Sequence, residues 1–303
     1  MVDQIINMHK LIKYSLLIFL VLTACKSRNN ELDMPGYELD TGEIQIPEEA
    51  LSDIIQNISS PIEMAALVKD LGVPFDNDNL MDPDNTDSYS TNFKMAYTLG
   101  MLGADLGYLN VYNKTGSSVS YLSAINKLAD ALKVSQFFDF NTIKRLATSN
   151  SSLDSLIFLS VHSFNQMDEH LRETDRSNLS ALMITGIWIE GMYQVTRVID
   201  SRYNEELAEY IGEQKLILND LLLILNNYSR DDQFSSLIED YNQLKNIYDQ
   251  VKIRYETGEP ETREEDGMLV VVQQEESIVD ISDEVLDSLI KTIAIIRDKH
   301  LEI

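Results

Sequence analysis

Apolar residues recur every three or four positions over most of this chain, and few prolines or glycines interrupt them. That spacing places apolar side chains along one side of a helix, which another helix must then cover. With 12 glycines and 6 prolines, the chain is also poor in the turn residues of a β-rich fold. We predict an all-α fold, an antiparallel multi-helix bundle. The expected helices are 48–58, 61–71, 89–112, 117–134, 140–148, 152–173, 176–201, 204–228, 232–256 and 282–301.

One region before the last expected helix departs from this pattern. Residues 257–266 are charged and contain Gly258 and Pro260, so we expect an exposed loop there. Residues 268–272 are β-prone, and the sequence leaves open whether they pair as a strand or only pack.

The first 24 residues have the order of an export signal. Positive charge at Lys10 and Lys13 precedes an apolar run at 16–22, which ends shortly before Cys25. A helix needs about 20 apolar residues to cross a bilayer, so this run is too short for a permanent membrane span. We therefore predict a signal peptide over residues 1–24.

The segment Leu22-Thr23-Ala24-Cys25 resembles the lipobox of bacterial lipoproteins. The resemblance implies that Cys25 is lipidated and becomes the first residue of the mature chain. An ordinary secretory signal that happens to contain a cysteine is the alternative. Several acyl chains hold a protein firmly, so the expected partner is a membrane, contacted through lipid on Cys25. Residues 25–46 should form a flexible tether and residues 47–303 a single helical domain.

Cys25 is the only cysteine of the chain. Disulfides within the mature chain, a CxxC redox pair and a thiolate zinc site are therefore excluded. The sequence also contains no phosphate-binding loop, nucleophile elbow, HExxH pair or dinucleotide fingerprint. We predict no cofactor, no metal and no catalytic residues, and an enzyme is an unsupported alternative.

The strong negative charge limits the class of partner. The formal charge is −26, with 50 acidic and 24 basic residues, and it becomes −27 without residues 1–24. Phosphate backbones are bound by neutralising them with Lys and Arg, so we expect no nucleic acid partner. Anionic lipid should be repelled as well, which leaves the acyl chains as the expected membrane contact.

The predicted helix 89–112 contains Gly100, Gly103 and Gly107, and each glycine costs about 1 kcal/mol relative to alanine in a helix interior. Close approach of another helix is one explanation, and a ligand that needs space is the other. Asp105 and Tyr108 belong to the same segment.

The predicted helix 176–201 combines the only tryptophan, Trp188, with Glu190 and Tyr193 in an apolar context. A buried carboxylate is costly unless it is hydrogen-bonded or protonated, and burial raises its pKa. The segment is therefore either a core helix with a satisfied polar group or one wall of a ligand pocket that faces the helix 93–112.

His162 lies in a third apolar stretch. A core histidine is one interpretation. A site for a metal or for acid–base chemistry, formed with Asp105 and Glu190, is the other. The candidate pocket thus contains Asp105, Tyr108, His162, Trp188, Glu190 and Tyr193.

Residues 76–87 are rich in Asp and Asn, which calcium binds. Read as an EF-hand from Asp82, the segment has Asp87 at the glycine position and Phe93 at the final glutamate position. Turns and helix caps use the same residue types, and both interpretations stay open.

The segments 97–108, YTLGMLGADLGY, and 186–193, GIWIEGMY, resemble two motifs of a helical lipoprotein family of Bacteroidetes-type bacteria. The second motif usually reads close to GGWIEGLY, and Thr185 departs from its first glycine. The resemblance implies export and a helical fold, and it brings no catalytic residues. Residues 26–30 contain no acids, which in related lipoproteins favour the cell surface. We expect attachment to the outer membrane, facing the periplasm.

These observations predict a membrane-anchored envelope lipoprotein with a noncatalytic binding or scaffold role and an envelope protein as its partner. A small-ligand-binding protein is the first alternative, and a hydrolase or metal enzyme is the second.

Overall fold

The computed structural model describes residue 54 and residues 61–148, 153–258, 261–265, 268–272 and 275–301. The chain divides into two units, Met1–Ile44 and Gln45–Ile303, and every described residue belongs to the second. The predicted signal peptide, Cys25, the tether and, apart from Ile54, the expected helix 48–58 lie outside the described residues.

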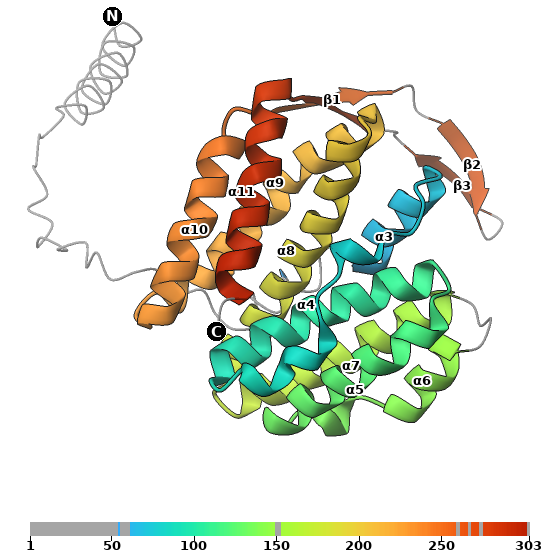
Figure 1. Cartoon of the computed structure of the whole chain (residues 1–303). Coiled ribbons are helices and arrows are strands. Elements are labelled where there is room, and N and C mark those ends of the chain that lie inside the picture. Colours follow the sequence, from blue (N-terminus) through green and yellow to red (C-terminus); the bar gives the residue numbers. More distant parts are fainter. Residues whose placement is uncertain are drawn as a thin grey trace, which may run out of the picture. The chain divides into compact units, whose positions relative to one another are not determined.

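The prediction of an all-α, multi-helix fold is confirmed (Figure 1). The α-helices are α3 (Pro61–Asp70), α4 (Asn92–Val111), α5 (Thr115–Ala131), α6 (Phe140–Thr148), α7 (Leu153–Glu173), α8 (Ser177–Ser201), α9 (Glu205–Asn226), α10 (Asp232–Tyr248) and α11 (Asp283–Leu301). Short 3₁₀ helices are η1 (Asn77–Asn79), η2 (Pro83–Ser88) and η3 (Ser135–Phe137). Among the described helices, none is long and apolar enough to cross a bilayer.

Side-chain caps fix where several helices begin. Thr91, Asn204 and Asp231 are the N-caps of α4, α9 and α10, and each side chain accepts a hydrogen bond from a backbone N–H of the first turn. Such a cap satisfies one of the donors that have no partner inside the helix.

Three helices end on a residue in the left-handed backbone region without using glycine. Asn113, Lys133 and Asp175 have φ of 56°, 59° and 54°, just after α4, α5 and α7. In each case the next backbone N–H donates to a carbonyl of the last turn, which is the usual way to close a helix end. These turns allow α5 and α8 to begin within a few residues.

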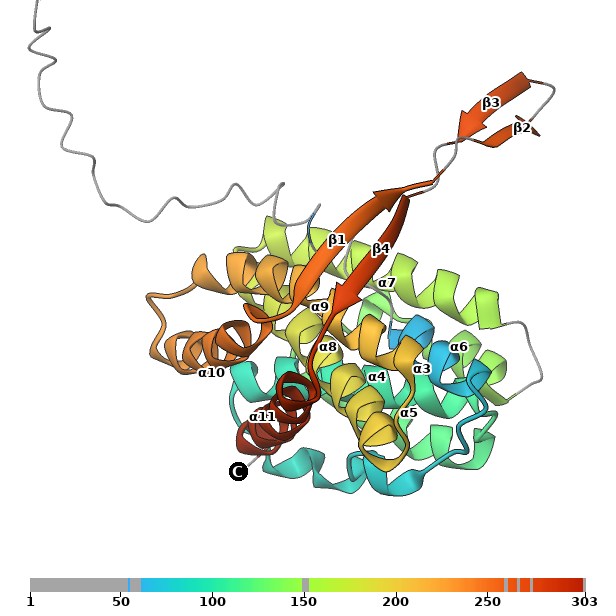
Figure 2. The ribbon, with the colours of Figure 1, turned by 90° about the horizontal axis from the view of Figure 1, so that it is seen from above.

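A β arm replaces the loop that the sequence predicts for residues 257–266. Strand β1 (Lys252–Thr257) pairs antiparallel with β4 (Glu275–Asp280), and β2 (Glu261–Glu265) pairs antiparallel with β3 (Met268–Val272). The loop prediction was wrong because pairing with β3 outweighs the low strand propensity of a charged segment. Figure 2 shows β1 and β4 running across the helices and β2 and β3 extending beyond them.

The expected helix 232–256 also overruns, since α10 ends at Tyr248 and β1 follows from Lys252. Strand β4 lies against α9 where that helix carries Gly212. A Cβ at Gly212 would lie 2.3 Å from Cγ1 of Val279, so the glycine provides the room for this contact.

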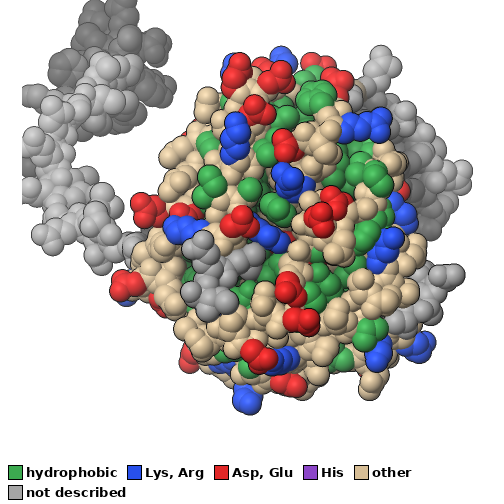
Figure 3. Space-filling view, viewed as in Figure 1, with side chains coloured by type: hydrophobic (Ala, Val, Ile, Leu, Met, Phe, Trp, Pro, Cys, Tyr) green, Lys and Arg blue, Asp and Glu red, His purple; other side chains and the backbone are tan. Residues whose placement is uncertain are grey.

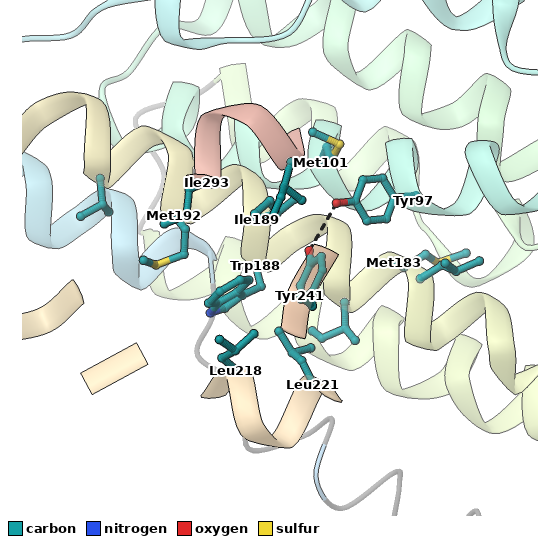
Figure 4. Packing of buried hydrophobic residues seen from close by; sticks show 14 of the residues in the cluster. Tyr97, Met101, Met183, Trp188, Ile189, Met192, Leu218, Leu221, Tyr241 and Ile293 are labelled. Carbon is teal, nitrogen blue, oxygen red and sulfur yellow. Dashed lines mark hydrogen bonds between the residues drawn. The ribbon is translucent and has the colours of Figure 1, made fainter. Parts of the chain in front are cut away.

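The hydrophobic core lies mainly among α4, α8, α9, α10 and α11. Trp188, Tyr97 and Tyr241 are among its largest fully buried side chains (Figure 4). The side chain of Trp188 donates from Nε1 to Oε1 of Gln214 at 3.0 Å, so its one polar atom is satisfied inside the core.

Candidate functional site

The helices α4 and α8 make the most extensive helix–helix contact, and glycine is the reason. A Cβ at Gly100 would lie 2.0 Å from the carbonyl oxygen of Met183, and a Cβ at Gly186 would lie 2.1 Å from that of Tyr97. The two backbones therefore touch. A Cβ at Gly103 would have no neighbour within 4 Å, so the packing explanation holds for Gly100 and not for Gly103.

The contacts also show how the two helices run. Tyr97 meets Gly186 near the start of α4, and Asp105 meets Gln194 two turns later. Positions farther along α4 thus meet positions farther along α8, so the pair runs in the same direction. This arrangement brings the carboxyl groups of Asp105 and Glu190 together in the core.

Asp105 and Glu190 are both fully buried. The Oδ2 atom of Asp105 accepts a hydrogen bond from the backbone N–H of Met81 at 3.0 Å, and Oδ1 accepts from Nε2 of Gln194 at 2.8 Å. The Asp105 carboxyl also lies within hydrogen-bonding reach of Glu190.

Arg297 of α11 supplies the compensating charge. Its Nη2 donates to Oε1 of Glu190 at 2.8 Å and its Nε donates to Oε2 at 2.9 Å. This is the two-pronged geometry that matches a guanidinium to a carboxylate. The guanidinium carbon also lies 4.4 Å from the ring centroid of Tyr193, within the range of a cation–π contact.

Asp105 and Glu190 are buried beside a single cation, Arg297, so their pKa values differ. Burial raises the pKa of Asp105 well above its usual value, and the neighbouring charge of Glu190 raises it further. Burial also raises the pKa of Glu190, but the hydrogen bonds and charge of Arg297 oppose that rise. Asp105 is therefore the more readily protonated of the two acids, and Glu190 is the one whose negative charge Arg297 compensates.

The Asp105–Glu190–Arg297 cluster is closed to solvent and its polar atoms have partners within the protein. It ties α4, α8 and α11 to the segment around Met81. A chemical step needs a substrate at the reacting atoms, and these carboxyl groups have no exposed surface to offer one. The arrangement suits a structural role in the core.

The other predicted pocket residues have separate surroundings. The hydroxyl of Tyr108 accepts from the backbone N–H of Asp76 at 3.2 Å. Trp188 packs 5.8 Å from the ring of Tyr241, whose hydroxyl lies 3.3 Å from that of Tyr97 (Figure 4).

His162 does not join Asp105 and Glu190. It is exposed on α7, where its ring stacks on Phe158 with centroids 6.1 Å apart. The hypothesis of a metal or acid–base site built from these three residues is therefore wrong. The helix around His162 has a solvent-exposed side, which the apolar composition of this stretch did not predict.

Sequence reasoning missed the second ionic cluster, which also involves α11. Lys299 donates from Nζ to both carboxylate oxygens of Asp240, at 2.8 and 2.7 Å. Nε2 of His300 lies 2.8 Å from Oδ2 of the same carboxylate. Burial lowers the pKa of His300, against the opposing effect of Asp240.

One sequence signal for Arg297 existed, because it follows Ile293 by four residues on the apolar side of the last helix.

The Asp- and Asn-rich segment 76–87 forms turns. Asp76 and Asp82 each accept a backbone N–H two residues later and so begin η1 and η2. Asp87 pairs with Lys127 of α5. Among the residues that the structure describes, no group of three or more His, Cys, Asp or Glu side chains is placed to hold a metal ion.

A surface hollow of about 320 Å³ lies where α4, α8 and α10 begin. Apolar side chains and a polar set line it: Phe93, Leu179, Leu182 and Phe234 with Asn92, Asp175, Arg176, Asn178, Asp231 and Gln233. None of the six predicted pocket residues belongs to this lining, although the hollow does lie between the two predicted helices.

The comparisons with known proteins give no relative. No family model, no curated protein and no solved structure matches the chain.

Proposed function

We propose that this protein is a lipid-anchored protein of the bacterial envelope whose helical domain is a noncatalytic binding or scaffold module. The lipobox-like segment that ends at Cys25 is the observation that carries the anchor. The closed cluster of Asp105, Glu190 and Arg297 supports a noncatalytic domain, because the ionisable core residues serve to hold helices together.

Metabolic labelling with a palmitate analogue in the native host tests the anchor. Wild-type protein should take up the label and sediment with membranes, while Cys25→Ser should lose the label. Unlabelled wild-type protein would contradict lipidation. Surface labelling of intact cells then tests the proposed attachment facing the periplasm, since only surface-exposed protein reacts.

Copurification from gently solubilised membranes tests the binding role. An envelope partner in fixed stoichiometry with wild-type protein, lost with Cys25→Ser, is the expected result. Recovery of the protein alone, under conditions that preserve other envelope complexes, would argue against a scaffold.

Small-ligand binding is the second candidate, and the hollow at the start of α4, α8 and α10 favours it. Its volume is at the low end for ligand sites, and its rim offers amides together with charges of both signs. A small zwitterionic or polyhydroxylated molecule fits that chemistry. A screen that follows the melting temperature should find ligands whose effect disappears in Asn178→Trp, which fills the hollow, and persists in Ser288→Trp on the exposed surface of α11.

A further inference from the structure

The hollow at the start of α4, α8 and α10 has an apolar floor. Leu179, Leu182 and Phe234 are buried there, and Phe93 is half-buried beside them. The rings of Phe93 and Phe234 pack edge to face with their centroids 5.4 Å apart, so each ring holds the other in place. A ligand that fits this floor needs one apolar side.

The rim of the hollow provides three amides. Asn92, Asn178 and Gln233 lie in the first turns of α4, α8 and α10 respectively. Within the part of the chain that the structure describes, none of these side-chain amides makes a hydrogen bond. Each amide both donates and accepts, as a hydroxyl group does. The rim therefore suits a ligand that carries several hydroxyl groups.

The charged residues of the rim favour a neutral ligand. Among the described lining residues, Asp175 and Asp231 are acidic and Arg176 is the only basic one. Asp231 already accepts from the backbone N–H of Gln233, and Arg176 already donates to the carbonyl of Leu132, which leaves fewer charged partners for a zwitterion. The chain carries a formal charge of −26, and Figure 3 shows many acidic side chains on the face that carries α10 and α11. An anion is therefore repelled.

We propose that this hollow binds one neutral monosaccharide ring. A pyranose has C–H groups on its faces and hydroxyl groups around its edge, so one face packs on the apolar floor while the edge hydrogen-bonds the rim amides. The negative face of an aromatic ring such as Phe93 attracts these C–H groups. The volume of about 320 Å³ suits a single ring. The inference deepens small-ligand binding, the second candidate function, and rests on it.

Saturation-transfer NMR on the full-length protein tests the inference, because it detects ligands with a Kd on the order of mM. The protein is solubilised in a polyoxyethylene detergent, which contains no sugar. The sugar probes are the methyl glycosides of glucose, galactose, mannose and N-acetylglucosamine. Alanine and glycine betaine are the zwitterionic probes.

At least one glycoside should receive saturation, and high salt should leave its affinity unchanged because the ligand is neutral. Phe93→Leu, which removes the ring but keeps an apolar side chain, and Gln233→Ala should each weaken binding about two- to tenfold. Gln243→Ala is the matched control, since Gln243 is exposed on α10 and does not line the hollow. Melting temperatures verify that the variants fold.

The outcomes separate the sugar from the site. If no glycoside binds but alanine or glycine betaine does, and Asn178→Trp abolishes that binding, the sugar inference is overturned and small-ligand binding stands. Glycoside binding that persists in Asn178→Trp, or that falls equally in Gln233→Ala and Gln243→Ala, also overturns the inference. If no probe binds and the melting-temperature screen finds no ligand, the inference and the second candidate function both fail.

Discussion

Replacing Arg297 with methionine removes the cation that compensates Glu190 and keeps a side chain of comparable length. Glu190 is fully buried and both of its oxygens accept hydrogen bonds from Arg297, at 2.8 and 2.9 Å. Removing one partner of a buried ion pair typically costs about 3–5 kcal/mol of unfolding free energy, because the other charge stays buried without compensation. We expect Arg297→Met to lose that amount at pH 7.

The pH dependence identifies the cause of the loss. Without Arg297, burial raises the pKa of Glu190 and only the hydrogen bond with Asp105 still lowers it, so the folded variant holds a proton that the unfolded chain releases above pH ~4.3. The folded state then binds more protons, and stability falls as pH rises. The unfolding free energy of the variant should drop about 1.4 kcal/mol per pH unit more steeply than that of the wild type between pH 5 and 7.

Urea unfolding followed by the fluorescence of Trp188 measures both effects, since Trp188 is the only tryptophan and is buried. The double variant Glu190→Gln with Arg297→Met is the control, and it should recover part of the loss because no charge is left uncompensated. Equal stability of Arg297→Met and wild type at pH 7, or parallel pH dependences, would refute the assignment of charge to Glu190.

Four further substitutions test the packing and the proton of the same core. Burial and the charge of Glu190 raise the pKa of Asp105, so above pH ~3.9 the folded protein holds a proton that the unfolded chain has released. Wild-type stability should therefore decline as the pH rises. Asp105→Asn should flatten that decline, which urea unfolding at pH 5 and 8 measures. Gly100→Ala should lower the unfolding free energy by about 1–3 kcal/mol, because the added methyl group forces α4 away from α8. Gly103→Ala should raise it by up to about 1 kcal/mol, because a methyl group there meets open space. Similar melting temperatures for the two variants would exclude backbone contact at Gly100 as the cause. Trp188→Phe should cost about 1–3 kcal/mol because it leaves the Gln214 amide without its donor, and full stability in calorimetry would show that this hydrogen bond contributes nothing.

Helical periodicity predicted most of the fold because each helix buries one side against its neighbours. It predicted the bounds of α6 directly and those of α8 to within a residue. It failed where pairing decides structure, since the charged strand β2 has no strand signal of its own and depends on β3. The overrun of α10 has a related cause, because Val251 and Tyr255 continue the helical spacing of Leu244 and Tyr248 by chance, whereas β1 pairs with β4.

The candidate site was predicted only in part. Glu190 and Asp105 were identifiable because a carboxylate in an apolar helix needs a partner. Arg297 was recognisable only as a basic residue on the apolar side of the last helix; its pairing with Glu190, 107 residues away, has no local signal. His162 misled for the opposite reason: apolar neighbours suggested burial, but Phe158 beside it is largely exposed.

The position of α11 in the sequence has a consequence for the order of folding. The basic residues that pair with the buried carboxylates of Glu190 and Asp240 both lie on this helix. The helix follows every other described element in the chain. A chain synthesised from its N-terminus cannot neutralise these buried carboxylates until α11 has been made. Stable closure of the core before the chain is complete is thereby disfavoured, and nascent chains halted before residue 297 should remain sensitive to proteases.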